Sequence, residues 1–145
     1  LASFGLQAYY IIMEAFVGKW KMEKSEGFDD VMKCLGVGFI NRKLGNTMKP
    51  NFVVESLGDG RYRMKSESTV KTTEFICRLG EEFTEITPDG REVRSIITIE
   101  NGVMKHVQKG DGKVTYIDRE IEGNTMKTTV KVDDFVCVRI YTKFE

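Results

Sequence analysis

The chain has 145 residues, which suits one domain and is short for two. Its 22 basic and 22 acidic residues give a formal net charge of zero, which argues against a general binder of nucleic acids or other polyanions. Valine, isoleucine and threonine supply 37 residues, whereas alanine and leucine supply only 9. The composition therefore favours β-strands and argues against a helical bundle.

The N-terminal residues and the cysteines bear on domain boundaries and compartment. Residues 1–12 differ in character from the rest of the chain, so we expect a leader or an extension there and one domain over residues 13–145. No apolar run reaches the roughly 18–20 residues of a transmembrane helix. The three cysteines are far apart and form no C-x-x-C motif, namely Cys34, Cys77 and Cys137. We therefore expect unpaired thiols in a cytoplasmic protein.

The first predicted elements are one strand and two short helices. Residues 16–22 are expected to form the strand. In residues 28–44, apolar residues then recur at the i, i+3, i+4 and i+7 spacing of one helix face, namely Phe28, Val31, Met32 and Leu35. Gly36 can end this helix, and a second short helix from Phe39 should end before Pro50. Because such short helices cannot form the main core, we expect them to cap one end of a sheet structure.

Beyond residue 50 the chain reads as a series of antiparallel strands. Turn signals such as Gly58-Asp59-Gly60 and Asn101-Gly102 recur, mostly at intervals of about 9–12 residues, the rhythm of a β-sandwich or a β-barrel. Between them, apolar and charged residues alternate in residues 61–68, 91–100 and 125–132, which predicts one buried and one solvated face. A meander of hairpins that closes on itself would also remove the exposed strand edges.

Arg119 departs from this alternation, because it shares one face of residues 113–121 with two isoleucines. A buried guanidinium without a partner is costly, and a bound anion would offset its charge. The planar fork of an arginine matches a carboxylate, and a tyrosine hydroxyl beside it can donate a further hydrogen bond. An ordinary ion pair with Asp118 or Glu120 is the alternative interpretation.

The last strand carries a second arginine, Arg139, whose direction the pattern leaves open. It shares parity with Phe135, Cys137 and Tyr141. The opposite face is also apolar, with Val136, Val138, Ile140 and Phe144. Parity alone therefore does not decide which side of this strand faces inward.

Several segments together resemble the intracellular fatty-acid-binding proteins, and the resemblance covers residues 13–145. The matching segments are GKWKM at 18–22, GFDDVM at 27–32, LGVG at 35–38, KP at 49–50, SEST at 66–69, RE at 119–120 and VRIY at 138–141. The resemblance implies an all-β fold, a ten-stranded antiparallel up-and-down β-barrel shaped like a clam shell, with a helix-turn-helix lid. It also implies non-enzymatic binding and transport of long-chain fatty acids.

The resemblance further implies which residues contact the ligand. The fatty-acid carboxylate would meet Arg119, Arg139 and Tyr141, which places Arg139 and Tyr141 on the inner face. Phe28 and Met32 match apolar ligand contacts. Val70 falls where many members have a portal phenylalanine, so the resemblance does not fix how tight the portal gate is here. Retinol carriers tend to have glutamine at the arginine positions, so an acid fits better than an alcohol.

Other functions are less well supported by the sequence. A carrier of another hydrophobic carboxylate such as retinoic acid remains the alternative. His106 is the only histidine and lies in a predicted strand, so neither a Ser-His-Asp triad nor a metal cluster is indicated, and we expect no cofactor. We expect a monomer, and basic residues on or near the helices, such as Lys43 and Lys49, could contact anionic membranes transiently during ligand transfer.

Overall fold

The computed structural model describes residues 12–145, so the predicted leader or extension lies outside the described residues except for its last residue. The first strand, β1 (Gly18–Glu26), does not begin at residue 16 as predicted. Residues 12–16 form a helical turn instead, and the Phe16 carbonyl accepts a hydrogen bond from the Trp20 indole at 2.9 Å. Gly18 joins the two with φ at 137°, and a Cβ there would lie 2.5 Å from the Glu145 carbonyl oxygen, so glycine is required.

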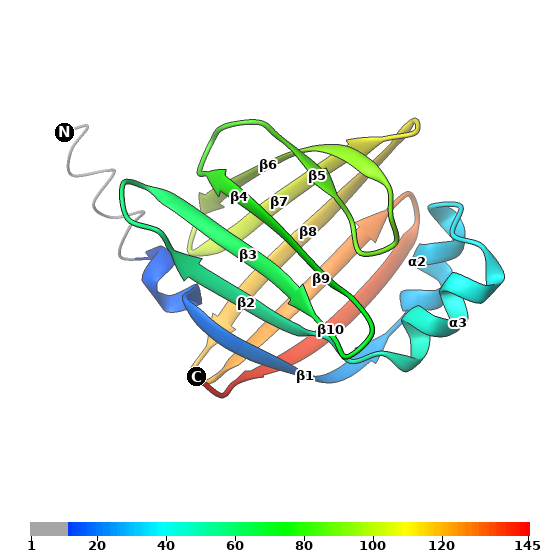
Figure 1. Cartoon of the computed structure of the whole chain (residues 1–145), viewed down its shortest axis with the longest axis horizontal. Coiled ribbons are helices and arrows are strands. Elements are labelled where there is room, and N and C mark those ends of the chain that lie inside the picture. The colour runs from blue at the N-terminus through cyan, green and yellow to red at the C-terminus, as the bar shows by residue number, and fades with distance from the viewer. Residues whose placement is uncertain (1–11) are drawn as a thin grey trace.

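The remaining elements follow the predicted order. After β1 come the helices α2 (Phe28–Cys34) and α3 (Phe39–Thr47). The other strands are β2 (Asn51–Ser56), β3 (Arg61–Glu67), β4 (Thr72–Arg78), β5 (Phe83–Ile86), β6 (Glu92–Glu100), β7 (Val103–Gly110), β8 (Lys113–Glu122), β9 (Thr125–Val132) and β10 (Phe135–Lys143). They form one antiparallel sheet of ten strands in the order β4-β3-β2-β1-β10-β9-β8-β7-β6-β5 (Figure 1). The up-and-down barrel expected from the sequence is therefore confirmed.

The barrel is nearly closed rather than fully closed. The sheet order begins at β4 and ends at β5, so within the described residues no ladder of hydrogen bonds joins these two strands. The prediction that closure removes the strand edges is therefore wrong at this place. Phe75 of β4 instead stacks on Phe83 of β5, with ring centroids 4.9 Å apart and an interplanar angle of 28°. Side-chain packing thus bridges the two edges where backbone pairing stops.

The two helices lie over one end of the barrel, opposite the helical turn at residues 12–16 (Figure 1). Helix α2 is seated through Val31, which packs with Val132 and Cys137 of the last two strands. Gly36 follows it with φ at 82°, in the left-handed region that ends helices, as predicted. Arg42 of α3 connects the two helices, because its Nε donates to the Asp29 carboxylate of α2 at 3.3 Å. Its Nη1 also donates to the Val37 carbonyl in the linker at 2.8 Å. Among residues 12–145, no helix is both long and apolar enough to span a membrane.

The inward-facing residues form a core at the end of the barrel away from the helices. This cluster is wholly buried at Met13, Phe16 and Trp20, and it continues through the inner faces of the strands. The alternation predicted for residues 61–68, 91–100 and 125–132 is confirmed, since one face of each carries buried apolar residues, namely Met64, Ile97 and Met126. Lys65, Arg94 and Lys127 lie on the opposite faces and are not buried. The interior toward the helices is not filled by side chains, and the candidate site lies there.

Candidate functional site

A cavity of about 380 Å³ lies inside the barrel beneath the helices. Such a volume falls in the range of small-molecule sites. The six residues singled out by the sequence all line it: Phe28, Met32, Val70, Arg119, Arg139 and Tyr141. Phe28 and Met32 come from α2, and Val70 lies in the turn between β3 and β4, where it is 63% exposed. Residues far apart in the sequence thus meet at one internal space.

One polar part of the cavity wall comes from the inner face of three neighbouring strands. In the strand register, Arg119 of β8 pairs with Thr128 of β9, and Thr128 pairs with Arg139 of β10. Tyr141 lies on the same face of β10 and is buried. The two arginines are each only 9% exposed. Both guanidinium groups therefore lie inside the barrel, which decides the direction of Arg139 that parity left open.

Arg139 lies directly beneath the first helix. Its Nε donates a hydrogen bond to Ser25 Oγ at 3.1 Å, and Ser25 is its partner in the β1–β10 register. Its guanidinium carbon lies 3.6 Å from the centroid of the Phe28 ring, a cation–π contact. Within residues 12–145 no carboxylate forms a salt bridge with it. The charge of Arg139 is therefore met by a hydroxyl and a ring face, and not by an anion of the chain.

Arg119 lies deeper and is hydrogen-bonded through a histidine. Its Nη1 is 3.2 Å from Nδ1 of His106, and its guanidinium carbon is 4.3 Å from the Phe52 ring centroid. Burial lowers the pKa of Arg119 from its ordinary value, but arginine stays protonated in proteins. The predicted alternative of an ion pair with a strand neighbour is wrong, because Asp118 pairs with Lys105 at 2.9 Å and Glu120 is exposed.

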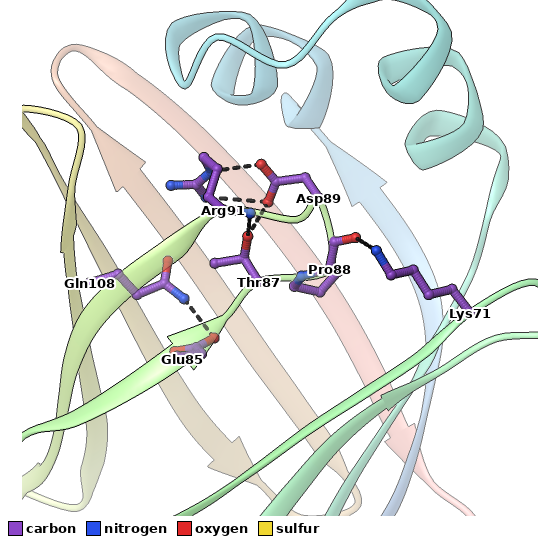
Figure 2. A network of polar contacts seen from close by, with 7 residues as sticks. All are labelled: Lys71, Glu85, Thr87, Pro88, Asp89, Arg91 and Gln108. Carbon is purple, nitrogen blue, oxygen red and sulfur yellow. Dashed lines mark hydrogen bonds and ion pairs between the residues drawn. The ribbon is translucent and has the colours of Figure 1, made fainter.

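A buried carboxylate, Glu85, lies behind this histidine. It accepts hydrogen bonds from Ser95 at 2.8 Å and from Gln108 at 3.0 Å, and His106 Nε2 is 2.8 Å away (Figure 2 shows the Gln108 contact). Because arginine can only donate, His106 Nδ1 accepts from Arg119, and Nε2 therefore carries the proton that is donated to Glu85. His106 is thus a neutral bridge between a buried cation and a buried anion.

The pKa values of this pair follow from burial and from the hydrogen bonds. Burial lowers the pKa of His106, because the imidazolium is poorly solvated there, and the positive charge of Arg119 lowers it further. Together these effects outweigh the raising effect of Glu85. Burial alone would raise the pKa of Glu85, but the hydrogen bonds from His106, Ser95 and Gln108 outweigh it, so the net pKa is lowered. The carboxylate is therefore ionised and the histidine neutral at neutral pH.

The cavity opens between the helices and two turns of the barrel. In Figure 2, Lys71 of the β3–β4 turn reaches Pro88 of the β5–β6 turn, and its Nζ donates to that carbonyl at 3.0 Å. Beside it, Arg91 forms an ion pair with Asp89 at 2.6 Å, and the Thr87 hydroxyl donates to the same carboxylate at 2.7 Å. These contacts hold the β5–β6 turn and connect the two sides of the gap between β4 and β5 at its open end.

Sequence reasoning missed most of the buried polar network. His106 was expected to lie in a strand, which is confirmed, but its contacts with Glu85 and Arg119 were not expected. Parity could have placed His106 and Gln108 inward, since Met104 shares their face. The sequence did not indicate that Glu85 is buried, because β5 has only four residues, and so short an alternation does not assign an inner face.

The described residues offer no place for a metal. No group of three or more histidine, cysteine, aspartate or glutamate side chains in residues 12–145 could hold an ion. Cys34, Cys77 and Cys137 form no disulfide there, and burial raises the pKa of Cys77 to about 12, so this thiol is not a ready nucleophile. The site instead offers an apolar chamber with two inward cations.

Comparison with known proteins identifies relatives over nearly the whole chain. The fatty acid-binding protein homolog 1 of Echinococcus granulosus is 64% identical over 131 residues, covering 90% of this chain and 98% of that protein. The crystal structure of the Echinococcus granulosus fatty-acid-binding protein 1 covers 91% of this chain and 99% of its own, with 63% identity and a TM-score of 0.90. A Schistosoma mansoni fatty acid binding protein in complex with arachidonic acid is 39% identical, with a TM-score of 0.87, and covers 92% and 98% of the two chains.

A comparison of the chain with models of protein families gives the same relationship. The model of the lipocalin / cytosolic fatty-acid binding protein family matches residues 17–143. This match spans the barrel from β1 to β10 together with both helices. The chain therefore belongs to the lipocalin / cytosolic fatty-acid binding protein family.

Proposed function

We propose that this protein binds long-chain fatty acids and carries them inside the cell without chemical change. The carboxylate is held by Arg119, Arg139 and Tyr141, and the acyl chain lies in the apolar part of the cavity. The observation that carries the proposal is the pair of buried guanidinium groups on one wall of an internal chamber. Two cations in such a place require an anion nearby. The only buried carboxylate among residues 12–145 is that of Glu85, and it already contacts three donors, Ser95, His106 and Gln108.

The two ends of the ligand are expected to contribute differently to the free energy of binding. Burying about sixteen methylene groups releases on the order of 12 kcal/mol, at about 0.8 kcal/mol each, before binding entropy and cavity water reduce it. The apolar tail therefore supplies most of the affinity. The two arginines and the tyrosine select the acid head group and fix its orientation.

Relatives support this assignment of ligand class. The Schistosoma mansoni protein described above was solved with arachidonic acid, a long-chain fatty acid. The family consists of binding proteins rather than enzymes, which agrees with the expected absence of catalysis. We extend the fatty-acid ligand to this chain because the cavity and the two inward arginines provide the groups that such an acid needs.

The ligand enters and leaves at the helix end in this proposal. Phe28 and Met32 of α2 contact the acyl chain, and Val70 lines the open rim. The protein acts as a cytosolic monomer. The exposed residues Lys43 and Lys49 provide positive charge near the rim for transient contact with anionic membranes.

A displacement assay tests the ligand class. A fluorescent long-chain fatty acid is bound first and is then competed with oleate, retinoic acid and retinol. We expect oleate to displace it at the lowest concentration and retinol at the highest, because retinol has no carboxylate for the arginines. Stronger displacement by retinoic acid than by oleate would favour the alternative carrier, and displacement by retinol as efficient as by oleate would refute the acid-binding role.

A further inference from the structure

Thr128 lies at the centre of the row that joins the two buried arginines. It is the direct register partner of Arg119 on one side and of Arg139 on the other. Its side chain lines the cavity and is only 5% exposed. Its Oγ1 is a buried polar atom that has no hydrogen-bond partner among residues 12–145. A buried hydroxyl without a partner costs free energy, so its retention in the cavity wall calls for an explanation.

Both neighbouring arginines turn away from this hydroxyl. Arg139 donates toward β1, to Ser25, and Arg119 donates toward β7, to His106. Paired strands lie about 4.8 Å apart, so the backbones of the two arginines are about 10 Å apart with Thr128 midway between them. A group that sits on Thr128 is therefore placed between two positive charges.

The chemistry of these three side chains selects one kind of group. A carboxylate only accepts hydrogen bonds, and it has two oxygens with room for several donors. The threonine hydroxyl can donate to one of these oxygens while the flanking cations attract the negative charge. An ammonium group would be repelled by both arginines, and an ester would gain little from the charges.

We propose that Thr128 is a further head-group-binding residue, whose hydroxyl donates a hydrogen bond to the ligand carboxylate between Arg119 and Arg139. This inference rests on the proposed fatty-acid function and makes it more specific. It centres the head group over β9, whereas an anchor built only from Arg139 and Tyr141 would centre it over β10.

The test compares two variants and two ligands by calorimetry. Thr128→Val removes the hydroxyl and keeps the shape, and Thr128→Ser keeps the hydroxyl. We expect oleate to bind Thr128→Val about 10-fold or more weakly, the usual loss for a hydrogen bond to a charged group, and Thr128→Ser to bind like the original protein. Methyl oleate, which has the same tail and no charge, should bind both variants equally. Thr129→Val is the matched control, because Thr129 is the next residue of β9 and faces outward.

Two further readouts distinguish binding from packing. With carboxyl-¹³C oleate, the pKa of the bound acid should rise in Thr128→Val, because a donor to the ionised form has been removed. The ligand-free Thr128→Val protein should melt at the same temperature or higher, because an unsatisfied buried hydroxyl is gone. A structure of the unaltered protein with oleate needs no variant, and it should place a carboxylate oxygen within about 3 Å of Thr128 Oγ1.

The outcomes separate this inference from the proposed function. Unchanged oleate affinity in Thr128→Val, equal losses for oleate and methyl oleate, or a carboxylate beyond hydrogen-bond distance in the complex would each overturn the role of Thr128. Arg139→Gln is measured in the same assay. If it weakens oleate binding while Thr128→Val does not, only the threonine fails, and if both bind oleate like the original protein, the proposed head-group site itself fails.

Discussion

Arg139 is a buried cation of the cavity wall that forms no salt bridge within residues 12–145. Its partners in the chain are the Ser25 hydroxyl and the Phe28 ring, and neither is an anion. Arg119, in contrast, is connected to the Glu85 carboxylate through His106. The two arginines therefore differ in what a ligand adds to them. In the proposed complex a carboxylate would give Arg139 its first anionic neighbour, whereas Arg119 is already connected to one through His106.

Replacing Arg139 tests this difference at the level of one side chain. We expect Arg139→Gln to weaken oleate binding about 10- to 100-fold, the usual loss of a charge-assisted hydrogen bond, without unfolding the barrel. The ligand-free variant should melt no lower than the original protein, because a buried cation is costly. Calorimetry gives the affinity and circular dichroism the melting temperature. Arg94→Gln, on the outer face of β6 and paired with Glu82, controls for loss of charge alone, and equal affinities of the two variants would contradict the prediction.

At the scale of elements, the buried polar network joins four consecutive strands. Glu85 of β5 is connected to Ser95 of β6, to His106 of β7 and, through the histidine, to Arg119 of β8. These strands lie next to the gap in the sheet, where backbone pairing is incomplete. The network therefore fixes the inner face of this part of the barrel, and its protonation affects the stability of the fold.

Acid should weaken the barrel in two steps. The folded-state pKa of His106 is below its ordinary value of 6.5, so the unfolded chain binds the extra proton first and stability falls as the pH drops below about 6.5. Glu85 adds a second loss below its ordinary value of 4.5, since its folded-state pKa is also lowered. We expect His106→Gln, which keeps a donor and an acceptor, to lose the first step and retain the second. Urea unfolding from pH 7 to pH 4 measures both, and an unchanged profile in the variant would exclude His106 as the source.

Polar contacts join the two helices, beside the close approach of Gly45 in α3 to Met32 in α2. Arg42 of α3 contacts the Asp29 carboxylate of α2 at 3.3 Å and donates to the Val37 carbonyl, and Asn46 donates to the same carboxylate at 2.9 Å. Only α2 is firmly packed on the barrel, whereas α3 has no buried residue. Helix α3 is therefore the part of the lid that can move at small cost.

Loosening this contact should speed ligand release. We expect Arg42→Gln to raise the rate at which a fluorescent fatty acid leaves the protein by about 2- to 5-fold, since a partly exposed ion pair contributes up to about 1 kcal/mol. The melting temperature of the barrel should change little. Stopped-flow transfer to excess albumin measures the rate. Lys43→Gln removes a charge from the next, exposed residue of the same helix, and a rate equal to that of this control would exclude α3 as the gate.

At the scale of the whole molecule, the barrel is a sheet of ten strands whose two ends meet without pairing. The stacked rings of Phe75 and Phe83 close this gap from the inside, and His106 lies edge-on to Phe75 at 5.7 Å. The Lys71 contact with the Pro88 carbonyl spans the same gap at the open end (Figure 2). Side chains, and not a ladder, therefore complete the wall of the cavity.

Removing one ring of the stack tests this closure. We expect Phe83→Ala to lower the free energy of unfolding by about 2 kcal/mol, roughly half the loss for a fully buried phenylalanine, because Phe83 is half-buried. Urea denaturation gives the value. Phe144→Ala removes a ring outside the stack that is more exposed, at 49%, and should therefore cost less. A loss in Phe144→Ala as large as that in Phe83→Ala would show that the stack adds nothing to closure.

The sequence by itself determined the fold class, the two helices and the inward face of several strands. These follow from local properties, since turn residues mark the hairpins and period-2 alternation separates the wet face from the buried one. The resemblance to the fatty-acid-binding proteins also singled out six residues, and all six line the cavity, although their roles remain proposals. The start of β1 was wrong because a helical turn and a glycine at positive φ replace the expected extended chain.

Only the tertiary structure decided what surrounds each buried charge. Whether Arg119 faces Asp118 or His106 depends on the twist and register of β7 and β8, which bring residues thirteen positions apart together. The incomplete closure between β4 and β5 and the unpartnered hydroxyl of Thr128 likewise arise from the packing of distant segments. Local patterns specify which side of a strand is buried, but the partner of a buried polar group is set by contacts that close over long stretches of chain.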